Sequence, residues 1–226
     1  MLSAIILAAG QSRRLKSAVS KPLVHIGTKP AIVYSLSAFN KHPDVDEIIL
    51  VLNAKNQGQI AKAIKHYAFK KIRAFVLGGK RRQDSVYQGL KEISLNADWV
   101  LIHDAARPFI DQKSITEVIK AARKTGAAIL GVPVKATIKS INSCGQVKQT
   151  LNRADLWEIQ TPQVFKKELI LKAYRKYSRS NVTDDAALVE KLKKIVKIVP
   201  GSYQNIKITT PEDLLFARTI ARRSAG

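Results

Sequence analysis

The sequence predicts an α/β fold built around a parallel β-sheet, and two observations support this. Short apolar runs rich in Val, Ile and Leu alternate with amphipathic stretches from the first residues of the chain. The runs are apolar at nearly every position, which is typical of strands that helices cover on both faces. Strands joined by helices run parallel through right-handed crossovers and bind ligands beyond their carboxyl ends.

Each element follows from its local pattern. The strand-like segments before residue 135 are Ser3–Leu7, Glu47–Leu52, Ile72–Leu77, Trp99–His103 and Ala127–Val132. The amphipathic stretches between them predict helices at Ala31–Asn40, Ile60–Tyr67, Ser85–Ile93 and Ser114–Thr125. After residue 153 we expect helices near Lys167–Tyr177, Asp184–Lys193 and Pro211–Arg222, with strands near Ile195–Val199 and Asn205–Ile208.

The segment Lys135–Arg153 departs from this pattern. "KATIKSINSCGQVKQTLNR" alternates apolar and polar residues around a Ser-Cys-Gly turn, which predicts a β-hairpin. It has few large apolar residues and no crossover helix, so we expect it to project as an arm. No repeat, low-complexity tract or linker divides the chain, which predicts one domain over residues 1–226 with the arm at 135–153.

Composition narrows the class of protein. The 226 residues include 39 Lys and Arg against 17 Asp and Glu, a formal net charge of +22 that suits a polyanionic partner. Basic runs interleaved with aromatics and zinc-ligand spacings are missing from the sequence, so nucleic acid is the less favoured partner. A single cysteine, Cys144, fits a reducing cytoplasm, and no apolar run approaches the roughly 18 residues of a membrane span.

The first loop, within "LAAGQSRRL" (Leu7–Leu15), is suited to phosphate. Small residues let the backbone approach a ligand closely, and arginines pair with phosphate. The sequence has neither a G-x-G-x-x-G turn nor a G-x-x-x-x-G-K-[ST] loop, but the first loop, which extends beyond this segment, carries Arg13, Arg14, Lys16 and Lys21. That density of cations suits a triphosphate bound along the loop, with a solvated basic loop as the alternative.

"HDAARPF" (His103–Phe109) places Asp104 at the end of an apolar strand. A carboxylate there is positioned to bind Mg²⁺ together with substrate phosphates. Alternatively, Asp104 pairs with Arg107 or caps the following turn. His103 has no clustered ligand partners, so we interpret it as a packing residue. A triphosphate loop facing a strand-end aspartate indicates nucleotidyl transfer.

Further motifs resemble one known family from almost one end of the chain to the other. In addition to the two above, they are "GGKRRQDSVYQGL", "AAILGVPVKATIK", "LNRADLWEIQTPQVF", "VTDDAALVE" and "SYQNIKITTPEDL". In this order they are similar to the bacterial 2-C-methyl-D-erythritol 4-phosphate cytidylyltransferases.

The resemblance implies a doubly wound, mostly parallel, Rossmann-like sheet with helices on both faces, and a homodimer formed through the arm. It implies a cytoplasmic, Mg²⁺-dependent transferase of non-mevalonate isoprenoid synthesis, which joins CTP to 2-C-methyl-D-erythritol 4-phosphate and releases pyrophosphate. By position, CTP would be lined by Ala8, Ala9, Gly10 and Ser12, with Gly79 and Ser85 near the cytosine and ribose. Arg14 and Lys21 would be catalytic, Asp104 would meet the metal, and the sugar phosphate would contact Arg107, Thr137, Arg153, Thr183 and Lys207.

Two positions depart from the family's commonest pattern. Ser12 stands where a second loop glycine is usual, and Lys80 stands where an acidic residue often follows the Gly-Gly pair. With Ser12, the first loop resembles that of the molybdopterin nucleotidyltransferases. The similarity of this sequence to those enzymes does not extend through the arm. Ribitol-5-phosphate cytidylyltransferase, with the same fold and reaction, is the closer alternative. "DAARPF" and "TPQVF" favour the erythritol enzyme.

Overall fold

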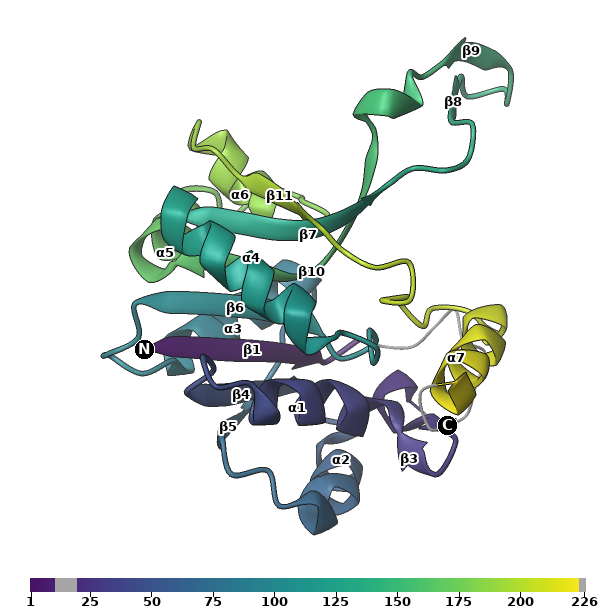
Figure 1. Ribbon diagram of the computed structural model, residues 1–226. Helices are drawn as coiled ribbons and strands as arrows, with labels where there is room; N and C mark the ends of the chain where they lie inside the picture. Colours follow the sequence, from purple (N-terminus) through teal and green to yellow (C-terminus); the bar gives the residue numbers. More distant parts are fainter. Residues whose placement is uncertain (11–19, 224–226) are drawn as a thin grey trace.

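A seven-stranded sheet forms the centre of the computed structural model, which describes residues 1–10 and 20–223 (Figure 1). Its strand order is β11-β7-β10-β6-β1-β4-β5. In chain order the strands are β1 (Leu2–Ala8), β4 (Glu47–Leu52), β5 (Ile72–Leu77), β6 (Trp99–Asp104), β7 (Ala127–Pro133), β10 (Trp157–Lys166) and β11 (Lys197–Pro200). Only β10 runs antiparallel to its neighbours within this sheet, so the mostly parallel prediction is confirmed.

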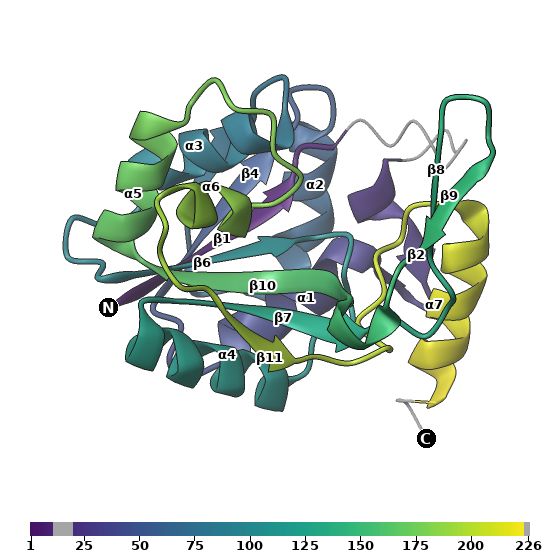
Figure 2. The same ribbon diagram turned by 90° about the horizontal axis from the view of Figure 1, so that it is seen from above.

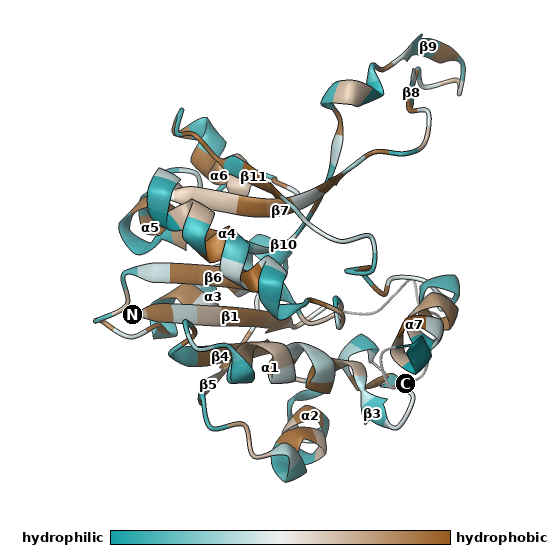
Figure 3. Ribbon diagram, viewed as in Figure 1, coloured by the Kyte–Doolittle hydropathy of each residue, from teal (hydrophilic) through white to brown (hydrophobic). Residues whose placement is uncertain are grey.

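Helices cover both faces of the sheet, and the last helix of the chain packs outside it. They are α1 (Ala31–Lys41), α2 (Gln57–Ile64), α3 (Arg82–Glu92), α4 (Gln112–Thr125), α5 (Lys167–Lys176), α6 (Ala186–Lys191) and α7 (Pro211–Arg223). Figure 2 shows α3, α5 and α6 on one side of the sheet and α1 and α4 on the other. Successive strand residues point to opposite faces, so Ile6 packs in the core under α1 and α4 while Ile5 packs under α3 and α5. Figure 3 shows the apolar residues along the strands, and α4 alternates between apolar and polar.

The strand order reverses beside β1. The chain adds β4 and β5 on one side of β1 and then crosses to β6 on the other. In doubly wound sheets, ligands bind in the crevice at this reversal, beyond the carboxyl ends of the strands. Leu7 of β1 pairs in register with Asp104 of β6. The start of the first loop and the start of "DAARPF" therefore lie at the same edge, as predicted.

The arm is a two-stranded hairpin, as predicted. Strands β8 (Lys139–Ile141) and β9 (Val147–Thr150) pair antiparallel, away from the main sheet (Figures 1 and 2). In the turn, the Asn142 Oδ1 accepts hydrogen bonds from the backbone N–H groups of Cys144 (3.0 Å) and Gln146 (2.9 Å), and Gly145 adopts a φ of +79°. Every residue of β9 is exposed in the single chain.

One expectation about the second half of the chain was wrong, and one strand was not anticipated. The segment Asn205–Ile208 is not a strand, because its backbone pairs with a loop instead: the Ile208 N–H donates to the Ala106 carbonyl at 2.8 Å. Strand β10 was not predicted, since polar residues and Pro162 interrupt its apolar pattern. Its register with β7 breaks there, between Gln160 and Gln163.

Smaller elements complete the body and adjust some boundaries. The short elements are β2 (His25–Ile26), β3 (Lys29–Pro30) and the 3-10 turns η2 (Lys21–Leu23), η3 (Lys65–Tyr67) and η4 (Arg153–Asp155). Helix α7 packs on the β2–β3 pair through a small apolar cluster containing Ile26 and Ala217. Helix α3 begins at Arg82 rather than at the predicted Ser85, which proves important at the site. Across the two described ranges, no helix has the length and apolar character needed to cross a membrane.

Candidate active site

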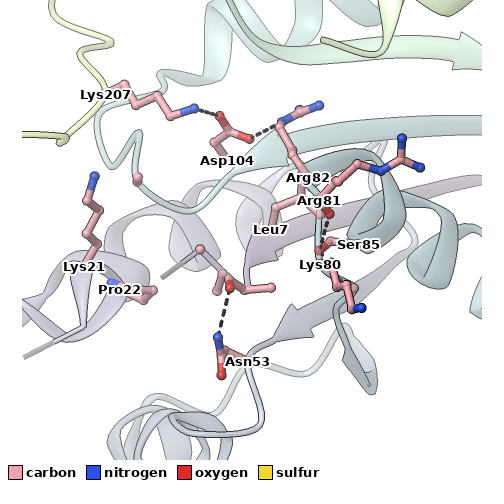
Figure 4. A pocket seen from close by; sticks show the side chains of 15 residues that line it. Leu7, Lys21, Pro22, Asn53, Lys80, Arg81, Arg82, Ser85, Asp104 and Lys207 are labelled. Carbon is pink, nitrogen blue, oxygen red and sulfur yellow. Dashed lines mark hydrogen bonds and ion pairs between the residues drawn. The ribbon is translucent and has the colours of Figure 1, made fainter. Parts of the chain in front are cut away.

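A pocket of about 360 Å³ lies at the sheet edge where the strand order reverses (Figure 4). It is lined by the end of β1 and by residues from η2, the start of α3, the end of β6 and the C-terminal segment. Its lining residues are Leu7, Ala8, Ala9, Gly10, Lys21, Pro22, Asn53, Gly79, Lys80, Arg81, Arg82, Ser85, Asp104, Ala106 and Lys207. Predicted CTP-binding residues and the predicted metal ligand therefore share one cavity.

Close backbone packing explains the Gly-Gly pair at one wall of this pocket. A Cβ at Gly78 would lie 2.5 Å from the Ala9 Cβ, and one at Gly79 would lie 2.4 Å from the Asp84 Cβ. The Gly79 N–H donates to the Ser85 Oγ at 3.1 Å, and that hydroxyl donates to the Arg81 carbonyl at 3.1 Å. These contacts place the Gly78–Gly79 backbone between Ala9, just after β1, and the first turn of α3, where a ligand can contact it.

The carboxylate of Asp104 forms ion pairs with two basic side chains. Its Oδ1 accepts from the Arg82 Nε at 3.2 Å and its Oδ2 accepts from the Lys207 Nζ at 2.5 Å (Figure 4). Burial alone would raise the pKa of this carboxyl, but Arg82 and Lys207 hold the pKa well below its ordinary value. The side chain is therefore an anion. Its partners are not the Arg107 side chain, which donates to the Asn205 carbonyl (2.7 Å) and to the Ile159 carbonyl (3.3 Å).

Arg82 is a site residue that sequence reasoning missed. Its guanidinium contacts Asp104 and also donates from Nη1 to the buried Asp185 Oδ2 at 2.8 Å. The signal was its spacing: Arg82 precedes Ser85 by one helical turn, so both lie on the same face of α3. Because the helix was expected to start at Ser85, Arg82 lay outside the expected helix.

A second pocket, of about 420 Å³, adjoins the first and shares Arg82, Asp104 and Lys207 with it. Arg107 and Thr183 also line it, so three of the five residues predicted for the sugar phosphate gather here. Arg107 is buried, and its Nε has no hydrogen-bond partner in the described part of the chain. Burial lowers the pKa of Arg107, while the Asp104 carboxylate opposes that effect.

Two further predicted residues, Thr137 and Arg153, are not brought to these pockets. Thr137 and Arg153 are exposed at the base of the arm and line neither pocket, and the Arg153 Nη1 donates to the Lys135 carbonyl at 2.9 Å. Ser12 and Arg14 lie outside the described residues.

His103 is a core residue. Its Nε2 lies 3.0 Å from the Arg107 carbonyl oxygen, its Nδ1 lies 3.1 Å from the Thr161 Oγ1, and its ring contacts Phe39. Complete burial lowers its pKa to about 4, so the ring is neutral near pH 7. The prediction that His103 serves packing is confirmed.

One carboxylate, Asp104, is available for a metal in the first pocket. Among the described residues, no group of three or more His, Cys, Asp or Glu side chains could hold a metal ion. Mg²⁺ commonly uses one or two carboxylates together with substrate phosphates and water, and each Asp104 oxygen retains a lone pair beyond its contact with a cation. The residues present therefore fit Mg²⁺ that arrives with a phosphate ligand.

A doubly wound sheet with a cation-lined pocket at its reversal point is typical of α/β proteins that bind nucleotides. A sequence model of IspD, the 2-C-methyl-D-erythritol 4-phosphate cytidylyltransferase family, matches residues 2–223, and the chain belongs to this family.

Individual relatives agree with this assignment. The enzyme of that name from Dehalococcoides mccartyi (strain ATCC BAA-2266 / KCTC 15142 / 195) is 46% identical to this chain, over 98% of this chain and 96% of its own length. The enzyme of that name from Geobacillus thermodenitrificans is 44% identical, over 96% of this chain and 95% of its own length. The crystal structure of 4-diphosphocytidyl-2C-methyl-D-erythritol synthase from Anaerococcus prevotii is similar with a TM-score of 0.87, at 37% identity over 98% of this chain and 96% of that one. The Thermus thermophilus 2-C-methyl-D-erythritol 4-phosphate cytidylyltransferase gives a TM-score of 0.80, at 31% identity over 97% and 98%.

Proposed function

We propose that this chain transfers the cytidylyl group of CTP to 2-C-methyl-D-erythritol 4-phosphate, giving 4-diphosphocytidyl-2-C-methyl-D-erythritol and pyrophosphate. Family membership over residues 2–223 carries the proposal. The two adjoining pockets support it, because a nucleotide in the first and a sugar phosphate in the second would meet at their shared residues Arg82, Asp104 and Lys207.

The chemistry needs little more than positioning and charge. The acceptor is a phosphate monoester whose second pKa is about 6, so it is already a nucleophilic anion near pH 7. It attacks the α-phosphorus of CTP in line, an O–P bond forms, and pyrophosphate leaves with the electron pair of the bond that breaks. No activated Ser or Cys is required. The protein must hold two anions together and offset the charge that develops at the phosphorus.

The described cations are distributed for that task. Lys21 lines the first pocket, Arg107 lines the second, and Lys207 lines both. We assign Lys21, together with Arg14 of the first loop, to the reacting phosphates, and Arg107, Thr183 and Lys207 to the acceptor. Ala8, Ala9, Gly10, Gly79 and Ser85 would contact the nucleotide. When bound, Mg²⁺ would neutralise phosphate charge, with Asp104 as its protein ligand.

The arm supports a dimer in this proposal. A two-stranded hairpin is marginally stable alone in water, and twofold pairing is the commonest way to bury such a segment. Thr137 and Arg153 would then contact the acceptor in the partner's site, since neither lines a pocket of its own chain. The cytoplasm remains our proposal for the compartment, in keeping with one exposed, unpaired cysteine.

Pyrophosphate release tests the function. The purified chain is incubated with CTP, Mg²⁺ and, separately, 2-C-methyl-D-erythritol 4-phosphate or ribitol 5-phosphate. We expect turnover with the erythritol phosphate and much less with the ribitol phosphate. Efficient turnover of ribitol 5-phosphate alone would assign the chain to that acceptor instead.

A further inference from the structure

The guanidinium of Arg82 forms part of the wall between the two pockets and lines both of them. It enters from the first turn of α3, and Figure 4 shows it beside Asp104. Its side chain is 28% exposed, so it reaches pocket solvent while most of its length is covered. Any phosphate that reacts across the boundary between the pockets must pass close to this group.

Asp185 and Tyr174 hold Arg82 from behind. Asp185 has 1% of its surface exposed, and both of its carboxylate oxygens accept hydrogen bonds. Oδ2 accepts from the Arg82 Nη1 at 2.8 Å, and Oδ1 accepts from the Tyr174 hydroxyl at 2.5 Å. The Asp185 backbone N–H donates to the Gln163 Oε1 at 3.1 Å, which fixes the carboxylate at the start of α6. Burial and the neighbouring Asp185 raise the pKa of Tyr174, so its hydroxyl remains a donor.

This arrangement leaves binding capacity on Arg82. Its Nε and one Nη1 hydrogen are used by Asp104 and Asp185, whereas its Nη2 group has no hydrogen-bond partner among the described residues. Three cations, Arg82, Arg107 and Lys207, lie around the two carboxylates Asp104 and Asp185. Asp184 and Glu190 also line the second pocket, so the feature of this boundary that suits a phosphate is the unused planar donor on Arg82 rather than the net charge.

We propose that Arg82 is a further catalytic residue, whose guanidinium binds the phosphate transferred between the two pockets, and that Asp185 and Tyr174 are positioning residues which hold it there. The inference rests on the proposed cytidylyl transfer and assigns one more donor to its reacting centre. Lysine at this position would keep the charge but lose the fork that contacts Asp104, Asp185 and a phosphate together. The Tyr174 hydroxyl acts only through Asp185 and Arg82, so its removal should affect the same step to a smaller extent.

The test compares Arg82→Lys and Tyr174→Phe with the matched control Tyr177→Phe. Phenylalanine keeps the ring of Tyr174, which stacks on Tyr87, and removes only the hydroxyl. Tyr177 lies just beyond the end of the same helix and donates to the Lys191 carbonyl at 2.7 Å, without lining either pocket. Three quantities are measured for each variant: the single-turnover rate constant with saturating CTP and acceptor, the CTP dissociation constant without acceptor, and the melting temperature.

We expect Arg82→Lys to lower the single-turnover rate by roughly 10²-fold, the scale of one well-placed donor, with a much smaller change in CTP affinity. Tyr174→Phe should lower the same rate by roughly 10-fold, since misplacement by about 1 Å can cost up to about 10²-fold. It should add little in the Arg82→Lys background, because the two residues act as one unit. Tyr177→Phe should keep the rate.

A different result is expected if Arg82 and Tyr174 only stabilise the fold. If Tyr174→Phe and Arg82→Lys lower the melting temperature but leave the single-turnover rate unchanged well below it, the inference is overturned. Equal and additive losses from all three variants would also overturn it. Failure of the proposed function is distinguishable, because the wild-type chain would then show no cytidylyl transfer, whereas failure of the inference leaves wild-type transfer intact.

Discussion

The positions of Lys21 and Arg153 make the proposed dimer testable by complementation. Lys21 lines the first pocket of its own chain, whereas Arg153 lies at the base of the exposed arm and lines neither pocket. If the arm completes the partner's site, Lys21→Ala damages the site of its own subunit and Arg153→Ala damages the site of the partner. Each variant alone should be nearly inactive, since every site of its homodimer lacks one cation.

The recovered activity follows from how the two lesions distribute. In a mixed dimer, the subunit carrying Arg153→Ala keeps its own Lys21 and receives an intact arm, so its site is complete. The other site carries both lesions. Random pairing makes about half of the dimers mixed, so about a quarter of all sites are intact, and mixed dimers isolated alone should have about half of the wild-type turnover per dimer.

The assay is pyrophosphate release by mixed dimers purified through two different tags, one on each variant. Dimers of two differently tagged Lys21→Ala chains are the matched control and should stay inactive, because neither site has its lysine. Co-purification of both tags shows that mixed dimers form. If they form and remain inactive, Arg153 does not serve the partner's site, and the proposed role of the arm is refuted.

Four further predictions concern single residues. Lys21→Ala should lower the rate of the chemical step by roughly 10²-fold while weakening CTP binding far less, as single-turnover kinetics and calorimetry would show, because its charge acts mainly in the transition state; an effect on the Michaelis constant for CTP alone would contradict this. Asp104→Asn should fold, as judged by circular dichroism, but lose Mg²⁺-dependent activity, since an amide lacks the charge that a hard cation needs; a fully active variant would exclude the role. Gly89→Ala should destabilise the protein by about 1–3 kcal/mol in urea unfolding, because its Cβ would come within 2.7 Å of the Ile5 Cγ2. The control is Gly58→Ala, whose Cβ would have no atom within 4 Å, and it should be neutral or stabilising by up to about 1 kcal/mol. Equal effects of the two substitutions would contradict the packing argument. The pKa of buried His103 is about 4 in the folded chain against 6.5 when exposed. As the pH falls from 7 to 5, the unfolded chain takes up a proton that the folded chain does not, so the free energy of unfolding should fall by about 2 kcal/mol. His103→Gln should lose this dependence on pH, and an unchanged dependence would show that other groups cause it.

The apolar strands could be predicted from the sequence because burial on both faces leaves a plain signal. Glu47–Leu52 is buried at every position, and both its bounds were predicted. Strand β10 could not be predicted in the same way. Its polar residues have partners that only the fold supplies: Thr161 bonds to the Asp104 backbone N–H and Gln163 to Asp184 and Asp185. Locally, such a segment resembles a loop.

Site residues at the ends of strands could be predicted from the sequence. Site residues that are placed by pairing with distant parts of the chain could not. Asp104 ends β6 and Gly79 closely follows β5, so strand ends alone place them at one edge. Lys207 reaches Asp104 across 103 positions of the chain, from a segment without regular structure, and its placement came from the family resemblance alone. Arg82 was missed because its partner Asp185 is equally distant, at 103 positions, and no local pattern links the two.

The central claim is that this chain joins the α-phosphate of CTP to the phosphate of 2-C-methyl-D-erythritol 4-phosphate by direct attack. Its most direct test is mass spectrometry of the product formed with Mg²⁺, CTP and acceptor whose phosphate oxygens carry ¹⁸O. We predict a single cytidylylated product that retains all of the acceptor's label, including the bridging oxygen between the two phosphorus atoms, together with unlabelled pyrophosphate. Label in the pyrophosphate, or no joined product while CTP is consumed, would contradict the account.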